Sequence, residues 1–90
     1  MDKGSIISGS FFVLHYIKHE SPQYVFVAPK KMAKTAVLRN SLRRKGYNVI
    51  RLYDLKSCAG IFFFKKEALK ATIFEIKKDL DFILKKAKII

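Results

Sequence analysis

A run of side chains in the middle of the sequence has the chemistry to bind a polyanion. Its members are Lys30, Lys31, Lys34, Arg39, Asn40, Arg43, Arg44, Lys45 and Arg51. No acidic residue occurs between Glu20 and Asp54, and the 90-residue chain carries a formal net charge of +12. Guanidinium groups bind phosphate oxygens in pairs, and an Asn amide hydrogen-bonds a sugar, a phosphate or a base edge. A solvated helix face normally mixes the two signs of charge, so this pattern favours nucleic-acid binding, whether DNA or RNA.

The other reactive side chains do not form a catalytic or metal-binding pattern. His15 and His19 have no partner cysteine and no paired carboxylates, so a zinc or acid–base site is not expected. The single cysteine, Cys58, excludes an internal disulfide and indicates a reduced, cytosolic setting. The remaining carboxylates are expected to cap helices or to lie on solvated faces: Asp54, Glu67, Glu75, Asp79 and Asp81.

Aromatic and β-branched runs predict the strands that support these residues. We expect strands at 11–17 and 24–28, an edge strand at 5–8, and antiparallel pairing among these three neighbours. Alternation along 11–17 places Phe11, Val13, His15 and Ile17 on one face of that strand. The run 59–64 is apolar on both faces, which predicts a central strand with its three Phe residues in the core.

Two segments show helical periodicity. From residue 32 onward, Leu38, Leu42, Gly46, Val49 and Tyr53 recur at steps of three or four, which predicts one helix with Gly46 at a close contact. The alternative is a helix that ends at Gly46, followed by a strand at 48–53. In the second segment, Thr72 and Glu75 form a capping box ahead of a helical apolar stripe. That stripe consists of Ile76, Leu80, Ile83, Leu84 and Ala87.

These elements predict a single α+β domain over residues 1–90. The expected architecture is a small two-layer sandwich, with a mixed sheet, a βαβ crossover through the basic helix, and both helices on one face. No apolar run reaches the length of a membrane-spanning helix. Adhesion to an anionic membrane through the helix at 72–87 is a weaker alternative, because its apolar stripe is assigned to the core.

The order of residues over 30–44, KKMAKTAVLRNSLRR, resembles the signature of the bacterial ribonuclease P protein component. That family carries paired lysines after a strand, a short Ala/Val stretch, and then Arg-Asn-Arg, a hydrophobic residue and two basic residues. The similarity extends upstream to Gly4 and the Phe-Val-Leu run at 12–14. Downstream it includes the strand at 61–64, Ala68-Leu69 and the ending at 79–88. It therefore covers nearly the whole chain.

The resemblance implies a left-handed crossover and the role of accessory subunit in a cytoplasmic ribonucleoprotein that removes the 5′ leader of precursor tRNA. In that family the RNA subunit performs the hydrolysis with Mg²⁺, so the protein binds no cofactor and requires no stable protein partner. Matching positions imply contacts to the catalytic RNA from Lys30, Lys31, Lys34, Arg39, Asn40, Arg43, Arg44 and Lys45. They imply contacts to the leader from Phe11, Val13, His15, Tyr24 and Phe26. A non-enzymatic ribosomal or regulatory RNA-binding protein is the alternative reading.

Three departures from the family pattern bear on this reading. Ser41 replaces the usual arginine at the third motif position, and Gly46-Tyr47-Asn48 replaces a turn that normally contains Arg-Glu. The sequence also starts at the equivalent of the first strand, without the family's basic N-terminal helix. The chain is therefore expected to be either a minimal member or one with a trimmed start, and leader binding is the function that this affects.

Overall fold

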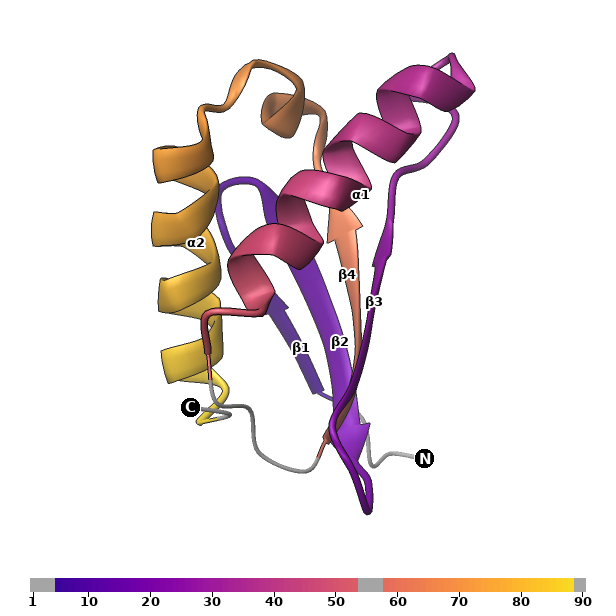
Figure 1. Cartoon of the computed structure of the whole chain (residues 1–90). Coiled ribbons are helices and arrows are strands. Elements are labelled where there is room, and N and C mark those ends of the chain that lie inside the picture. The colour runs from indigo at the N-terminus through magenta and orange to yellow at the C-terminus, as the bar shows by residue number, and fades with distance from the viewer. Residues whose placement is uncertain (1–4, 54–57, 89–90) are drawn as a thin grey trace.

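The computed structural model describes residues 5–53 and 58–88, and Figure 1 shows how they are arranged. Four strands and two α-helices follow one another with a short 3₁₀ helix, η1, between β4 and α2. Their bounds are β1 Ser5–Ser8, β2 Phe12–Lys18, β3 Gln23–Val27, α1 Ala36–Ile50, β4 Cys58–Phe64, η1 Lys66–Lys70 and α2 Ile73–Lys86. The chain thus has the predicted α+β class. Asp54, expected as a cap or surface carboxylate, lies outside the described residues.

The four strands form one mixed sheet in the order β1-β2-β4-β3. β4 is central as predicted, antiparallel to β2 and parallel to β3. The expected antiparallel pairing is found between β1 and β2, but it is wrong for β2 and β3. β4 lies between those two strands, with its alternate residues Phe62 and Phe64 buried on the face that the helices cover.

The connection from β3 through α1 to β4 is left-handed. In Figure 1, α1 lies in front of the sheet, both strands run upward, and β4 lies to the left of β3. A chain that rises, returns in front of the sheet and moves to the left forms a left-handed crossover. Crossovers between parallel strands are nearly always right-handed, so this is an uncommon topology. It is the hand that the resemblance implied.

Both helices cover the same face of the sheet and enclose one aromatic and aliphatic core (Figure 1). The ring of Phe12 contacts the rings of Phe26, Phe62 and Phe64, with centroids between 4.7 and 6.0 Å apart. The largest fully buried side chains are Phe12, Phe26, Phe62, Leu14, Leu42, Ile76, Leu80, Ile83 and Leu84. The opposite face of the sheet is not covered by either helix.

The basic segment forms one helix that continues through Gly46, so the predicted single helix is confirmed and the strand at 48–53 is not found. The helix begins later than the periodicity indicated, with Thr35 as its N-cap, and it ends at Ile50. A Cβ atom on Gly46 would lie 2.6 Å from the Phe26 ring. Gly46 therefore allows the helix to approach β3 closely.

α2 begins with the predicted capping box, in which the side chains of Thr72 and Glu75 each accept a backbone N–H. Of its apolar stripe, Ile76, Leu80, Ile83 and Leu84 are buried as expected and Ala87 is partly buried. The expectation that Asp79 lies on a solvated face is wrong, because this side chain is buried. Its two carboxylate oxygens accept the backbone N–H groups of Ser10 and Phe11 at 2.7 and 2.9 Å. Asp79 therefore fastens the β1–β2 turn to α2.

Candidate nucleic-acid interface

The loop between β3 and α1 is held by backbone hydrogen bonds that leave its lysines exposed. The carbonyl of Pro29 accepts the N–H groups of Met32 and Ala33 at 3.2 and 3.1 Å. Ala33 is fully buried, and the carbonyl of this residue accepts a hydrogen bond from Arg39 Nη1 at 3.0 Å. The N-cap Thr35 Oγ1 accepts the N–H of Leu38 at 3.1 Å. The loop is thereby fixed against the first turns of α1.

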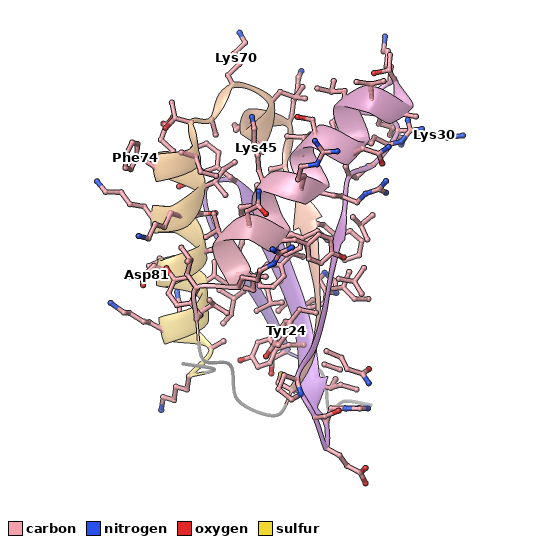
Figure 2. All side chains as sticks on the ribbon, in the orientation of Figure 1. Tyr24, Lys30, Lys45, Lys70, Phe74 and Asp81 are labelled. Carbon is pink, nitrogen blue, oxygen red and sulfur yellow. The ribbon has the colours of Figure 1, made fainter. Side chains whose placement is uncertain are left out.

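The residues predicted to bind RNA lie on this loop and on the outer side of α1. At 100° per residue, Arg39 and Arg43 lie on the flank facing β3, while Asn40 and Arg44 point outward. We call the following set the basic surface: Lys30, Lys31, Lys34, Arg39, Asn40, Arg43 and Arg44. Lys45 lies on the opposite flank, and Figure 2 shows it projecting toward α2, away from Lys30. Seven of the eight predicted residues are therefore brought together.

No carboxylate neutralises the basic surface within residues 5–53 and 58–88. The ion pair found there joins Lys85 and Asp81, both on α2. On α1, Arg43 Nη2 donates a hydrogen bond to Asn40 Oδ1, which leaves the Asn40 amide N–H groups free to turn outward. Five of the seven side chains are exposed, and Arg39 and Arg43 are partly buried. This arrangement presents cationic donors that have no carboxylate partner among the described residues, which favours phosphate binding.

Tyr47 fixes the orientation of α1 relative to the sheet. Its hydroxyl oxygen accepts the backbone N–H of Phe26 at 3.2 Å, and its ring meets the Phe26 ring edge-on at 4.9 Å. This hydroxyl also satisfies a donor on the outer edge of β3. The residue therefore positions the basic helix and occupies part of an exposed sheet edge.

The sheet face opposite the helices, here called the open face, is apolar and almost uncharged. Strand register aligns Ile6, His15, Ile61 and Val25 in one row across all four strands. The aliphatic members of that row are 42–65% exposed. The residues of the open face are Ile6, Ser8, Val13, His15, Ile17, Gln23, Val25, Val27, Ala59, Ile61 and Phe63. None is a Lys, Arg, Asp or Glu, although the chain contains 19 Lys and Arg residues.

The structure corrects the placement of three residues expected on this face. Phe26 is 1% exposed and stacks on Phe62 in the core, so it is unavailable for leader binding. Tyr24 is on the same helix-covered side, two positions earlier on β3. Phe11 precedes β2 and packs at the edge of the core beside α2. Only Val13 and His15 of the predicted set lie on the open face.

Sequence reasoning missed Phe63, which lies on the open face and contacts His15 with ring centroids 5.1 Å apart. The sequence predicts all three Phe residues of this strand in the core, and for Phe63 this prediction is wrong. Strand alternation contained the signal, because Phe62 and Phe64 cannot both point inward unless Phe63 points outward.

Burial raises the pKa of the Tyr24 phenol well above its ordinary value, and the neighbouring Cys58 adds to the rise. The pKa of Tyr53 is raised by burial and by Asp81, whose carboxylate accepts its hydroxyl hydrogen bond at 3.2 Å. Both phenols therefore remain protonated. Over the described residues there is no group of three His, Cys, Asp or Glu side chains placed to hold a metal ion.

A model of the ribonuclease P family matches residues 1–88, almost the entire chain. The chain belongs to the ribonuclease P protein family. It is accordingly the protein subunit of ribonuclease P, an RNA-binding component of that tRNA-processing ribonucleoprotein endoribonuclease, and membership implies association with the ribonuclease P RNA. This decides between the two readings of the sequence in favour of ribonuclease P.

Solved structures of ribonuclease P proteins share this fold. A Staphylococcus aureus mutant with defective mRNA degradation activity superposes with a TM-score of 0.87 at 22% identity, covering 98% of this chain and 78% of that one. Another S. aureus ribonuclease P protein gives a TM-score of 0.80 at 24% identity, covering 97% and 84%. The Thermotoga maritima protein gives 0.82 at 18%, covering 93% and 84%. A search of curated proteins gave no match.

No helix in the described ranges has both the length and the apolar character needed to cross a membrane.

Proposed function

We propose that this ribonuclease P protein docks on the catalytic RNA through the basic surface and holds the 5′ leader of precursor tRNA along the open face. The observation that carries the docking proposal is the acid-free cluster of cations on one side of α1. Each phosphate that such a cluster neutralises releases counterions, which favours binding and makes it depend on salt. Lys45, on the other flank, contributes to the general field around α1 rather than to the docking contacts.

The open face suits a single strand better than a duplex. It presents the His15–Phe63 ring pair among aliphatic side chains, and unpaired bases stack on rings of this kind. Its lack of Lys and Arg means that leader phosphates would have to point outward or toward Lys30 and Lys31, which follow β3. The protein would thus contribute binding and orientation.

The hydrolysis itself is assigned to the RNA subunit with Mg²⁺. The protein residues that we place at the interface are cations, an amide and apolar rings, and none is a paired acid and base for phosphodiester cleavage. Cations placed against phosphates reduce the number of Mg²⁺ ions needed to hold the RNA compact. The protein should act in this way with the catalytic RNA and precursor tRNA alone, without a further stable protein partner.

The docking proposal is tested by reconstituting the full chain with its cognate RNA subunit. Wild-type protein should lower the Mg²⁺ concentration needed for precursor tRNA cleavage. The double variant Arg39→Ala/Arg43→Ala should bind the RNA more weakly. Its plot of log affinity against log salt should be shallower by about 0.7–0.9 for each lost phosphate contact.

Lys66→Ala/Lys77→Ala is the matched control, because it removes the same charge from exposed positions on η1 and α2. It should leave the salt slope near the wild-type value. Equal slopes for the two double variants would show that net charge, rather than the basic surface, governs binding. A protein that neither binds the RNA nor changes the Mg²⁺ requirement would contradict the proposed function.

A further inference from the structure

A hollow of about 600 Å³ lies between the β1–β2 turn and α2, apart from the basic surface and bordering the open face at Ser8. Its volume is within the range of sites that bind small organic groups. Two aromatic side chains, Phe11 and Phe82, contribute to its lining. The polar lining includes Ser8, Ser10, Glu75 and Lys78. It therefore combines apolar walls with a few polar groups.

The turn that forms one wall of the hollow is held by two side chains, Asp79 and Lys65. Asp79 accepts the N–H groups of Ser10 and Phe11, as described above. Lys65 Nζ donates to Ser8 Oγ at 2.7 Å and to the Gly9 carbonyl at 2.6 Å. A Cβ on Gly9 would lie 2.5 Å from the Asp79 carboxylate, so the turn and helix are in direct contact. The hollow is consequently a preformed feature, and filling it would cost little ordering.

Lysines outnumber carboxylates around the hollow, with Lys65, Lys78 and Lys86 against Glu75 and Asp79. The two carboxylates keep their negative charge and both accept backbone N–H groups, Glu75 that of Thr72 at 2.9 Å and Asp79 those of the turn. Lys78 and Lys86 have no carboxylate partner within residues 5–53 and 58–88. Lys86 Nζ lies 5.5 Å from the centroid of the Phe82 ring. Cations beside exposed aromatic rings are the combination that binds single-stranded nucleic acid.

We propose that this hollow is a third RNA site, besides the basic surface and the open face, which takes one unpaired nucleotide of a single-stranded segment. The base contacts the rings of Phe11 and Phe82, and the adjoining phosphate lies against Lys78. The site is on the side of α2 that faces away from α1, so a strand bound there cannot occupy the basic surface at the same point. The helical layer would then hold two RNA segments at once, one on each of its opposite flanks.

The test uses a single-stranded oligoadenylate hexamer and an abasic ribose-phosphate hexamer as probes. The full chain carries Arg39→Ala/Arg43→Ala in every sample, which weakens the basic surface. In this background, Phe82→Ala should lower the affinity for oligoadenylate about 5-fold or more, the usual effect of losing one base stack. Phe82→Tyr should retain binding, because it keeps the ring. The abasic hexamer should bind weakly and should not distinguish these variants.

Phe74→Ala is the matched control. Phe74 is on the same helix and is 76% exposed, but it does not line the hollow, so its removal should change affinity by less than about twofold. Circular dichroism and thermal unfolding check that each variant is folded. Amide resonances of Ser10 and Phe11 should shift when oligoadenylate is added to the parent variant and should not shift with Phe82→Ala.

Three outcomes would overturn the site. The first is an unchanged affinity in Phe82→Ala, and the second is an equal loss in Phe74→Ala, which would indicate a nonspecific helix surface. The third is Phe82-dependent binding to anionic phospholipid vesicles without such dependence for oligoadenylate, which would indicate a membrane surface. None of these results bears on docking to the catalytic RNA, because that docking is measured through Arg39 and Arg43.

Discussion

At the scale of single residues, Gly46 is required because a side chain there would clash with the Phe26 ring, and not because its backbone conformation needs a glycine. No glycine in the part of the chain that the structure describes has a positive φ, and Gly46 lies inside a regular helix. Its missing side chain makes room for the Phe26 ring, which is stacked on Phe62 and cannot withdraw without opening the core. A position that weakens the helix locally therefore improves the packing between helix and sheet.

Gly46→Ala should consequently destabilise the protein although alanine is the better helix former. The gain in helix propensity is about 1 kcal/mol, whereas overpacking a filled core costs about 1–3 kcal/mol. We expect a net loss of about 1 kcal/mol in the free energy of unfolding, measured by urea denaturation. Asn48→Ala, at an exposed position two residues later, should be neutral or slightly stabilising. A stabilised Gly46→Ala protein would show that Phe26 can move.

At the scale of elements, the molecule separates its two proposed tasks between opposite layers. The helical layer carries the basic surface, and the sheet turns its uncharged open face to the other side. Alternation along each strand makes this possible, since one set of side chains forms the core while the other remains available to a ligand. Contacts on the open face can therefore change without disturbing the docking helix.

Loss of the ring pair on the open face should weaken binding to the leader alone. The variant His15→Ala/Phe63→Ala should reduce affinity for precursor tRNA about 5-fold or more in the reconstituted holoenzyme, by the loss of at least one base stack. Affinity for mature tRNA, which has no leader, should stay the same, and so should the salt slope of binding to the RNA subunit. An equal loss for both tRNAs would place the leader elsewhere on the protein.

Local patterns in the sequence predicted most elements. The errors concern which strands pair with each other and which side of the sheet a side chain lies on. Three predictions that depend on neighbouring residues are confirmed. They are the capping box at Thr72, the helix through Gly46 and the central position of β4. The separation of β2 from β3 depends on residues some 40 positions away along the chain, which no local pattern records. The misplacement of Phe26 has the same origin, because the inward set of a strand is decided by what packs against it.

The candidate site was predictable to a similar degree. The seven residues of the basic surface lie close together in the sequence, on one loop and one helix, so the sequence already predicts that they share one region. Lys45 of the same predicted set lies on the other flank of α1. The burial of Asp79 was not predictable, because a carboxylate in a helical pattern does not indicate that backbone N–H groups of a distant turn will donate to it. The hollow beside α2 combines a β turn with a helix about 70 residues later, and only the folded structure brings them together.

At the scale of the whole molecule, the two partly buried phenols of Tyr24 and Tyr53 link stability to pH. The folded state raises the pKa of Tyr24 and of Tyr53 above the ordinary value of 10.0, so it holds their protons more tightly than the unfolded chain does. Above that value the unfolded state binds fewer protons than the native state, and stability therefore falls as pH rises. The contribution is fully present below the ordinary pKa and is lost as pH rises through the raised values.

Tyr24→Phe should flatten this alkaline decline. Between about pH 9 and pH 11 the wild-type free energy of unfolding should drop more steeply than that of the variant, because phenylalanine has no proton to lose. Adding Tyr53→Phe should flatten the profile further. The slope is the readout, since the substitutions also change the stability at neutral pH. Parallel profiles for wild type and Tyr24→Phe would show that the phenol is accessible in the folded state.

The place of β4 between β2 and β3 also governs the order in which the chain can assemble during synthesis. Of the three strand pairings, only that of β1 with β2 can form before residue 58 has been made. β3 and α1 leave the ribosome with their apolar faces, including Phe26 and Leu42, lacking the strand that completes the layer beneath them. Such an incomplete intermediate exposes both an unpaired strand and a basic helix, and native strand pairing must await the last third of the chain. The basic segment of the chain is therefore synthesised before the strand that joins β3 and α1 to the rest of the sheet.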